Sequence, residues 1–133
     1  MFAHYLLFAG TCSAALDTYA RAFGAEVIGK QTYGDIPDPG FPVPPEMRDW
    51  ILHSRLRWEG TELMCADSSD RTHPGDNMYV SVACADEAHV RHAWDILAEG
   101  GVIYMDLVST FFSGLHGSLR DRFGVNWMFT VMS

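Results

Sequence analysis

The feature that most constrains the fold of this chain is a weak internal repeat. "YLLFAG" near the start resembles "YVSVAC" in the second half, and "AFGAEVI" resembles "AEGGVIY". Tyr5 and Tyr79 lie 74 positions apart, and Gly24 and Gly100 lie 76 positions apart. In each half an apolar segment, a helical segment and a glycine follow in the same order. The repeat predicts two modules, each with the element order βαβββ, within a single domain that spans residues 1–133.

The first module, about residues 1–67, is expected to contain one helix and four strands. The helix spans "AALDTYARAF" at 14–23, with Thr11 or Ser13 as its cap and Gly24 at its end. The predicted strands cover 4–9, 25–34, 50–58 and 61–67. The segment 35–49 holds five of the six prolines, which predicts a stiff loop.

The second module, about residues 77–133, repeats this order. We expect a strand at 78–85, a helix that starts at Asp86 and ends at Gly100–Gly101, and a strand at 102–108. "HGSLRD" and "VNWMFTV" supply the last two strands.

Composition excludes several classes of partner. A net charge of −8, from 17 acidic and 9 basic residues, argues against nucleic acid. Lys30 is the single lysine, so a basic membrane-binding patch is not expected, and no apolar run is long enough to cross a membrane. The start, "MFAHYLLFAG", does not have the pattern of a signal peptide. We therefore expect a cytoplasmic protein.

The three cysteines are predicted to be free thiols, because their number is odd and no CxxC spacing occurs. Most such cysteines are packing residues. Cys12 is a partial exception, since a helix N-terminus can lower the pKa of a thiol.

Three stretches resemble the vicinal oxygen chelate superfamily (glyoxalase I, bleomycin-resistance proteins, extradiol dioxygenases), and within it the PhnB-like group. They are "YLLFAGTCSAALDTYARAFGAEV", "HSRLRWEGTELMCAD" and "TFFSGLHGSLRDRFGVNWM". Phe112 departs from the group, which often has tryptophan there. The resemblance implies an α+β fold in which two βαβββ modules form curved mixed sheets around a ligand cavity. It also implies a homodimer.

The resemblance further implies where metal-dependent members of the superfamily place their ligands. The corresponding positions here are His4, Met64, Met78 and Met128. Methionine thioethers are soft and neutral, and they do not replace carboxylates for Zn²⁺, Ni²⁺, Fe²⁺ or Mn²⁺. We therefore expect no metal and no cofactor, although one histidine and three methionines suit copper(I) and the alignment can shift by one residue.

Strand 50–58 alternates between apolar and basic side chains. His53, Arg55 and Arg57 point to the face opposite Leu56 and its apolar neighbours. One interpretation is recognition of a small anionic molecule through charge-assisted hydrogen bonds. The alternative is that the arginines pair with nearby acids such as Glu59 or Asp67.

Aromatic and histidine side chains in the second module allow two interpretations. Phe111, Phe112 and Trp127 can line a cavity or pack in the core. His73 and His116 lie in segments that we expect to be solvated.

Three hypotheses for function follow. The first is a metal-free small-molecule-binding dimer whose cavity is closed by loop 35–49. The second is a metal-dependent lyase, isomerase or dioxygenase that uses His4, His53 and Asp67. The third is a structural or regulatory dimer with a filled cavity. The sequence assigns no catalytic residue. It has no glycine-rich strand–turn–helix for S-adenosylmethionine, which the methyltransferase name of some PhnB-like proteins would require.

Overall fold

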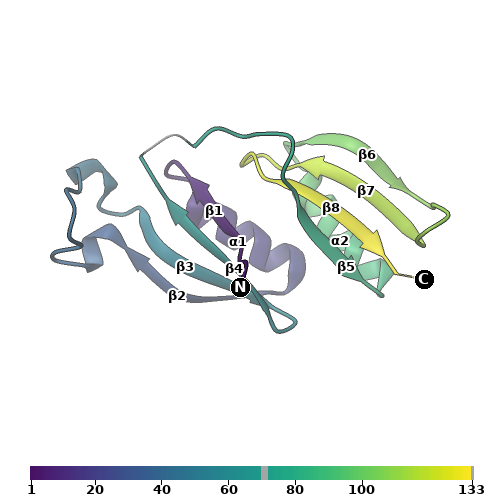
Figure 1. Ribbon diagram of the computed structural model, residues 1–133, viewed down its shortest axis with the longest axis horizontal. Coiled ribbons are helices and arrows are strands. Elements are labelled where there is room, and N and C mark those ends of the chain that lie inside the picture. The colour runs from purple at the N-terminus through teal and green to yellow at the C-terminus, as the bar shows by residue number, and fades with distance from the viewer. Residues whose placement is uncertain (70–71, 133) are drawn as a thin grey trace. The chain divides into compact units, whose positions relative to one another are not determined.

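The computed structural model describes residues 1–69 and 72–132. The chain divides into two compact units, which we call the first module (Met1–Thr72) and the second module (His73–Ser133). Each module has a four-stranded sheet with one helix across one of its faces (Figure 1). Among the described residues no helix is long and apolar enough to span a bilayer.

The sheet of the first module has the strand order β1-β4-β3-β2. Strands β1 and β4 are parallel, and the other neighbours are antiparallel. The elements are β1 (Tyr5–Phe8), α1 (Cys12–Phe23), β2 (Glu26–Thr32), β3 (Ile51–Trp58) and β4 (Thr61–Asp67). This is the predicted βαβββ order, and the bounds of the third and fourth strands are within one residue of those predicted.

Helix α1 packs through the apolar stripe that its sequence predicts. Leu16, Tyr19 and Phe23 are buried, since residues three and four positions apart lie on one face of a helix. Gly24 ends the helix in the left-handed conformation (φ 69°), and its N–H donates to the carbonyl of Ala20. Glycine adopts this conformation without steric cost.

The start of α1 differs from the prediction. Thr11 occupies the cap position, but its side chain makes no capping hydrogen bond. The carboxylate of Asp67, at the end of β4, instead accepts hydrogen bonds from the N–H groups of Gly10 (2.8 Å) and Cys12 (3.0 Å). This cap comes from a distant strand, so the residues next to the helix in the sequence carry no signal of it.

The second module repeats the arrangement with the strand order β5-β8-β7-β6. Strands β5 and β8 are parallel, and the other neighbours are antiparallel. Its elements are β5 (Val80–Cys84), α2 (Glu87–Ala98), β6 (Val102–Val108), β7 (Leu115–Arg120) and β8 (Asn126–Val131). Asp86 caps α2 as predicted and accepts hydrogen bonds from the N–H groups of Ala88 and His89.

The proline-rich segment contains short turns of helix. A 3-10 helix, η1 (Tyr33–Asp35), follows β2 directly, so the strand ends before the predicted residue 34. A second 3-10 helix, η2 (Pro45–Met47), buries Met47 at 5% exposure. The predicted α+β class and the two βαβββ modules are confirmed, while the enclosed cavity stays a prediction.

Candidate functional site

The face of the first sheet that is turned away from α1 holds most of the residues singled out in the first module. Met64 on β4 is aligned with Tyr5 on β1 and with Arg55 on β3. Aligned residues on neighbouring strands point to the same face of a sheet. The other face is buried at Ser54, Leu56 and Cys65. We call the exposed side the first open face; its central residues are Tyr5, His53, Arg55, Arg57, Glu62 and Met64.

Tyr5 and His53 form a hydrogen-bonded pair on this face. The Oη atom of Tyr5 lies 2.8 Å from Nδ1 of His53, and the two ring centroids are 5.7 Å apart. Partial burial, with a smaller contribution from Tyr33, raises the pKa of the Tyr5 phenol. The phenol is therefore neutral at physiological pH and can donate a hydrogen bond. The first open face thus presents a polar pair beside the Met64 thioether.

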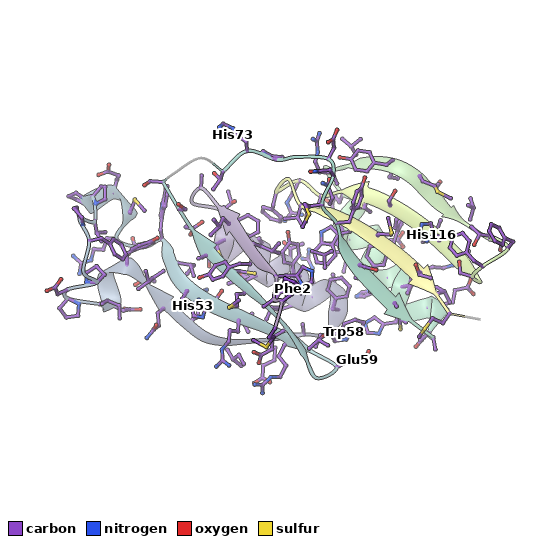
Figure 2. All side chains as sticks on the ribbon, viewed as in Figure 1. Phe2, His53, Trp58, Glu59, His73 and His116 are labelled. Carbon is purple, nitrogen blue, oxygen red and sulfur yellow. The ribbon has the colours of Figure 1, made fainter. Side chains whose placement is uncertain are left out.

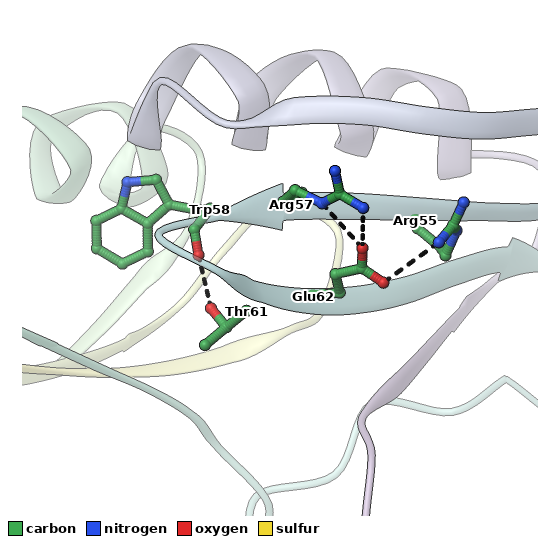
Figure 3. A network of polar contacts seen from close by, with 5 residues as sticks. All are labelled: Arg55, Arg57, Trp58, Thr61 and Glu62. Atoms are coloured by element: carbon green, nitrogen blue, oxygen red, sulfur yellow. Dashed lines mark hydrogen bonds and ion pairs between the residues drawn. The ribbon is translucent and has the colours of Figure 1, made fainter.

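Both arginines of strand β3 pair with one carboxylate, that of Glu62 (Figure 3). Nε and NH2 of Arg57 lie 3.0 and 2.9 Å from Oε2 of Glu62. NH1 of Arg55 lies 3.5 Å from Oε1. The partner is therefore Glu62, and not Glu59 or Asp67. Ion pairs between side chains as exposed as these contribute only ~0–1 kcal/mol to stability. Because so little stability depends on them, the arginines are available for another role.

The second module has a corresponding open face with Met128 at its centre. Met128 is aligned with Ser81 on β5 and with Ser118 on β7. Nδ1 of His116 lies 3.1 Å from Oγ1 of Thr130. We define the second open face by Ser81, His116, Ser118, Met128 and Thr130. Figure 2 shows His53 on β3 of the first module and His116 on β7 of the second.

His116 is half-buried in β7, whereas we expected its side chain to be solvated. The ring of Phe112 lies 5.1 Å from its imidazole. Phe112 and the neighbouring Phe111 are 56% and 101% exposed. Phe112 therefore lies next to the second open face, whereas Phe111 is in solvent.

Trp127 belongs to the core of the second module. It is 1% exposed, and its indole N–H donates to Oδ2 of Asp121 at 2.8 Å. Its ring packs against Phe129, which in turn contacts Trp94 of α2. Trp127 therefore packs in the core, which is one of the two interpretations that its sequence allowed. It lies on the face of the sheet opposite Met128.

His4 and Met78 lie just before the first strands of their modules and are exposed. The carbonyl of His4 accepts the N–H of Met64 at 3.1 Å. The carbonyl of Met78 accepts a hydrogen bond from Nδ2 of Asn126 at 3.0 Å. Their roles in ligand binding stay predictions.

The structure adds two residues that the sequence analysis did not select. Tyr5 and Ser81 are aligned with Met64 and Met128 and share their faces. These two residues are 76 positions apart, the same spacing as Gly24 and Gly100. Alignment of the repeat by its glycines, instead of by its tyrosines, pairs Tyr5 with Ser81.

The donor groups at these positions do not fit a hard divalent cation. The first open face offers a phenol and a thioether at the aligned positions, and the second offers a hydroxyl and a thioether. Hard cations prefer carboxylate oxygens, and borderline ions such as Zn²⁺, Ni²⁺ and Fe²⁺ also take imidazole nitrogens; neither group occurs at these four aligned positions. Among residues 1–69 and 72–132, no three His, Cys, Asp or Glu side chains are grouped for metal binding.

Two other candidates for chemistry have structural roles. The Asp67 carboxylate is 2% exposed and also accepts the N–H of Ile51 at 2.9 Å. Burial raises the pKa of the Cys12 and Cys65 thiols to about 12. The expectation of a lowered pKa at Cys12 is therefore wrong, because desolvation outweighs the effect of the helix N-terminus.

Comparison with known proteins places the chain among PhnB-like proteins. The family model described as 3-demethylubiquinone-9 3-methyltransferase matches residues 1–130. Protein YjdN of Escherichia coli is 32% identical over 136 residues, which covers 96% of this chain and 92% of that protein.

Solved structures agree with this placement. A Pseudomonas aeruginosa protein is 29% identical with a TM-score of 0.82, and covers 99% of this chain and 97% of its own. A PhnB protein from Bacillus cereus is 28% identical with a TM-score of 0.77, and the match covers 98% of both chains. Glyoxalase I from Zea mays (14% identity, TM-score 0.64) and FosX from Listeria monocytogenes (12%, 0.64) share the fold alone.

Proposed function

The chain belongs to the PhnB-like family of the vicinal oxygen chelate superfamily, and on this basis we propose that it binds a small organic molecule without a metal ion. The family membership supplies the scaffold, but one fold supports many activities. The proposal therefore depends on the side chains of the two open faces.

The observation that carries the proposal is the position of Met64 and Met128. Each lies on the central strand pair of its sheet, on the face away from the helix. A thioether is polarisable and apolar and adapts to irregular ligand surfaces. Methionine at these positions favours contact with an organic molecule over coordination of a cation.

The polar groups around the methionines suit recognition of such a molecule. Small-molecule sites combine an apolar lining with a few fixed polar groups that orient the ligand. On the first open face these are the Tyr5–His53 pair and the Arg55 guanidinium. On the second they are the His116–Thr130 pair and the two serines aligned with Met128.

We also propose that the protein is a cytoplasmic homodimer. Five apolar side chains of the edge strand β6 are 39–47% exposed, namely Val102, Ile103, Tyr104, Met105 and Val108. An exposed apolar strand is usually covered by another surface. The free thiols are consistent with a reducing compartment. Sedimentation equilibrium tests the dimer, which requires twice the mass of one chain; a monomer at micromolar concentration contradicts it.

Thermal denaturation in the presence of EDTA tests the binding proposal. A library of small organic compounds is screened against the purified protein, and hits are repeated with Met64→Ala, Met128→Ala and, as a control at an exposed site, Met132→Ala. We expect some compounds to raise the Tm of the protein in EDTA. This rise should be lost in Met64→Ala or in Met128→Ala and kept in Met132→Ala. Stabilisation that requires added Zn²⁺, Ni²⁺ or Mn²⁺ contradicts the proposal.

A further inference from the structure

The two arginines of the first open face use their guanidinium groups differently. Arg57 turns its Nε–NH2 edge to Glu62, and both nitrogens bond to Oε2. Arg55 meets the same carboxylate through NH1 at 3.5 Å, a long contact (Figure 3). The Nε–NH2 edge is one of the two sides on which a guanidinium can bind a carboxylate with two parallel hydrogen bonds. In Arg57 this edge is used by Glu62, whereas Arg55 has it turned elsewhere.

The free edge of Arg55 lies over a glycine. A Cβ atom added to Gly29 would lie 3.6 Å from both Nε and NH2 of Arg55. Gly29 has φ +62° and belongs to an irregularity of β2 between Ile28 and Gln31. Irregularities of this kind redirect side chains and are frequent next to binding sites. A Cβ at this distance would be in ordinary van der Waals contact with the guanidinium, so glycine at position 29 places no side chain against this edge.

Apolar surface lies beside Arg55 on the side of β4 and β1. Met64 is the aligned neighbour of Arg55, and Tyr5 follows on the next strand. Tyr5 and Leu7 are 44% and 52% exposed. Arg55, Arg57 and Glu62 together carry one positive charge, and Glu26, the residue of β2 that is aligned with Arg57, offsets it on the same face. A face without excess positive charge suits a monoanion with an apolar body better than a dianion, which the net charge of −8 would also repel.

We propose that the Nε–NH2 edge of Arg55 binds the carboxylate of a small organic acid whose apolar body lies on Met64 and Tyr5. This inference rests on the proposed metal-free function and names the chemical class of the ligand. The Met64 thioether is uncharged, so the positive charge beside it comes from Arg55. The Tyr5–His53 pair adds a second polar contact on the other side of Met64.

Nuclear magnetic resonance titration with benzoate tests this assignment, with benzamide as the neutral ligand of the same shape. The protein carries ¹⁵N label and methyl-labelled methionine, and its metal content is measured on the same preparation. We expect benzoate to shift the Arg55 Nε–H and Met64 methyl signals in a saturable way, and benzamide to shift neither.

Four variants complete the test. Arg55→Gln is expected to weaken benzoate binding by at least about 10-fold, and Arg55→Lys by a similar factor, since an ammonium has no planar edge. Arg91→Gln removes an exposed arginine of α2 that pairs with Glu87, and should leave the affinity within about 2-fold. Glu62→Gln should strengthen binding, because it removes the competing carboxylate.

Several results would overturn the inference. Equal shifts with benzamide, or unchanged affinity in Arg55→Gln, would show that Arg55 does not bind the carboxylate. Saturable binding of inorganic phosphate without binding of benzoate would contradict the ligand class. Shifts at Met128 and His116 alone would refute the role of Arg55 and leave metal-free binding in place, whereas stoichiometric metal in the preparation would refute the proposed function itself.

Discussion

Asp67 binds the backbone N–H of Cys12 at 3.0 Å, so the last residue of β4 holds the first turn of α1. The same carboxylate binds the N–H groups of Gly10 and Ile51, at the loop before the helix and at the start of β3. One buried side chain therefore fixes three segments of the first module. In the second module, Asp121 similarly accepts the N–H groups of Phe123 and Val125.

Asp67→Ala should lower the free energy of unfolding by about 2–4 kcal/mol, because three N–H groups, two of them in buried hydrogen bonds, lose their carboxylate acceptor. Urea denaturation measures the change. Asp86→Ala is the matched control, since Asp86 caps α2 at an exposed position and its loss should cost only about 1 kcal/mol. Equal losses in the two variants would contradict the role given to Asp67.

The thiols of Cys12 and Cys65 should make stability fall at high pH. Their pKa is about 12 in the folded protein, against an ordinary value of 9.0. Above pH 9 the unfolded chain loses these protons while the folded chain keeps them, so rising pH favours unfolding. The expected slope is about −1.4 kcal/mol per pH unit for each thiol between pH 9 and 11.

Urea denaturation at pH 8, 9, 10 and 11 measures this slope in the wild-type protein and in the Cys12→Ala/Cys65→Ala double variant. The variant is expected to be less stable at pH 8, because it has two cavities. Its stability should nevertheless change less with pH, and the difference between the two slopes isolates the thiols. Identical slopes would show that the thiols do not cause the loss.

Trp127→Phe should destabilise the second module by about 2–4 kcal/mol, because it creates a cavity and removes the N–H bond to buried Asp121. Trp58→Phe serves as the control. Trp58 is half-buried at the end of β3, where its ring packs against Phe23. We expect this second change to cost under about 1.5 kcal/mol. The account of Trp127 as a core residue fails if the order of the two losses is reversed.

The fold was predictable from local patterns in the sequence. Alternation along β3, the glycine that ends α1 and the Asp86 cap are signals that lie within a few residues of the structure they specify. The repeat then supplied the element order. The Asp67 cap was not predictable in this way, because its partner N–H groups lie 55–57 positions earlier in the chain.

The candidate site was predictable in part. Alternation placed His53, Arg55 and Arg57 on one face, but the choice of Glu62 as their partner depends on the register between β3 and β4. The role of Tyr5 depends on register as well, since a shift of one residue moves a side chain to the opposite face. The uncovered edge of Arg55 was not predictable, because the sequence does not show that Gly29 lies beside it.

The metal content of the purified protein tests the central claim most directly. Cells are grown with added Zn²⁺, Ni²⁺, Mn²⁺ and Fe²⁺, the protein is purified without chelator, and each metal is quantified by mass spectrometry. Because Met64 and Met128 offer only thioethers, we predict that each metal stays below about 0.1 ion per chain. About one tightly bound ion per chain, retained through gel filtration, would contradict the account.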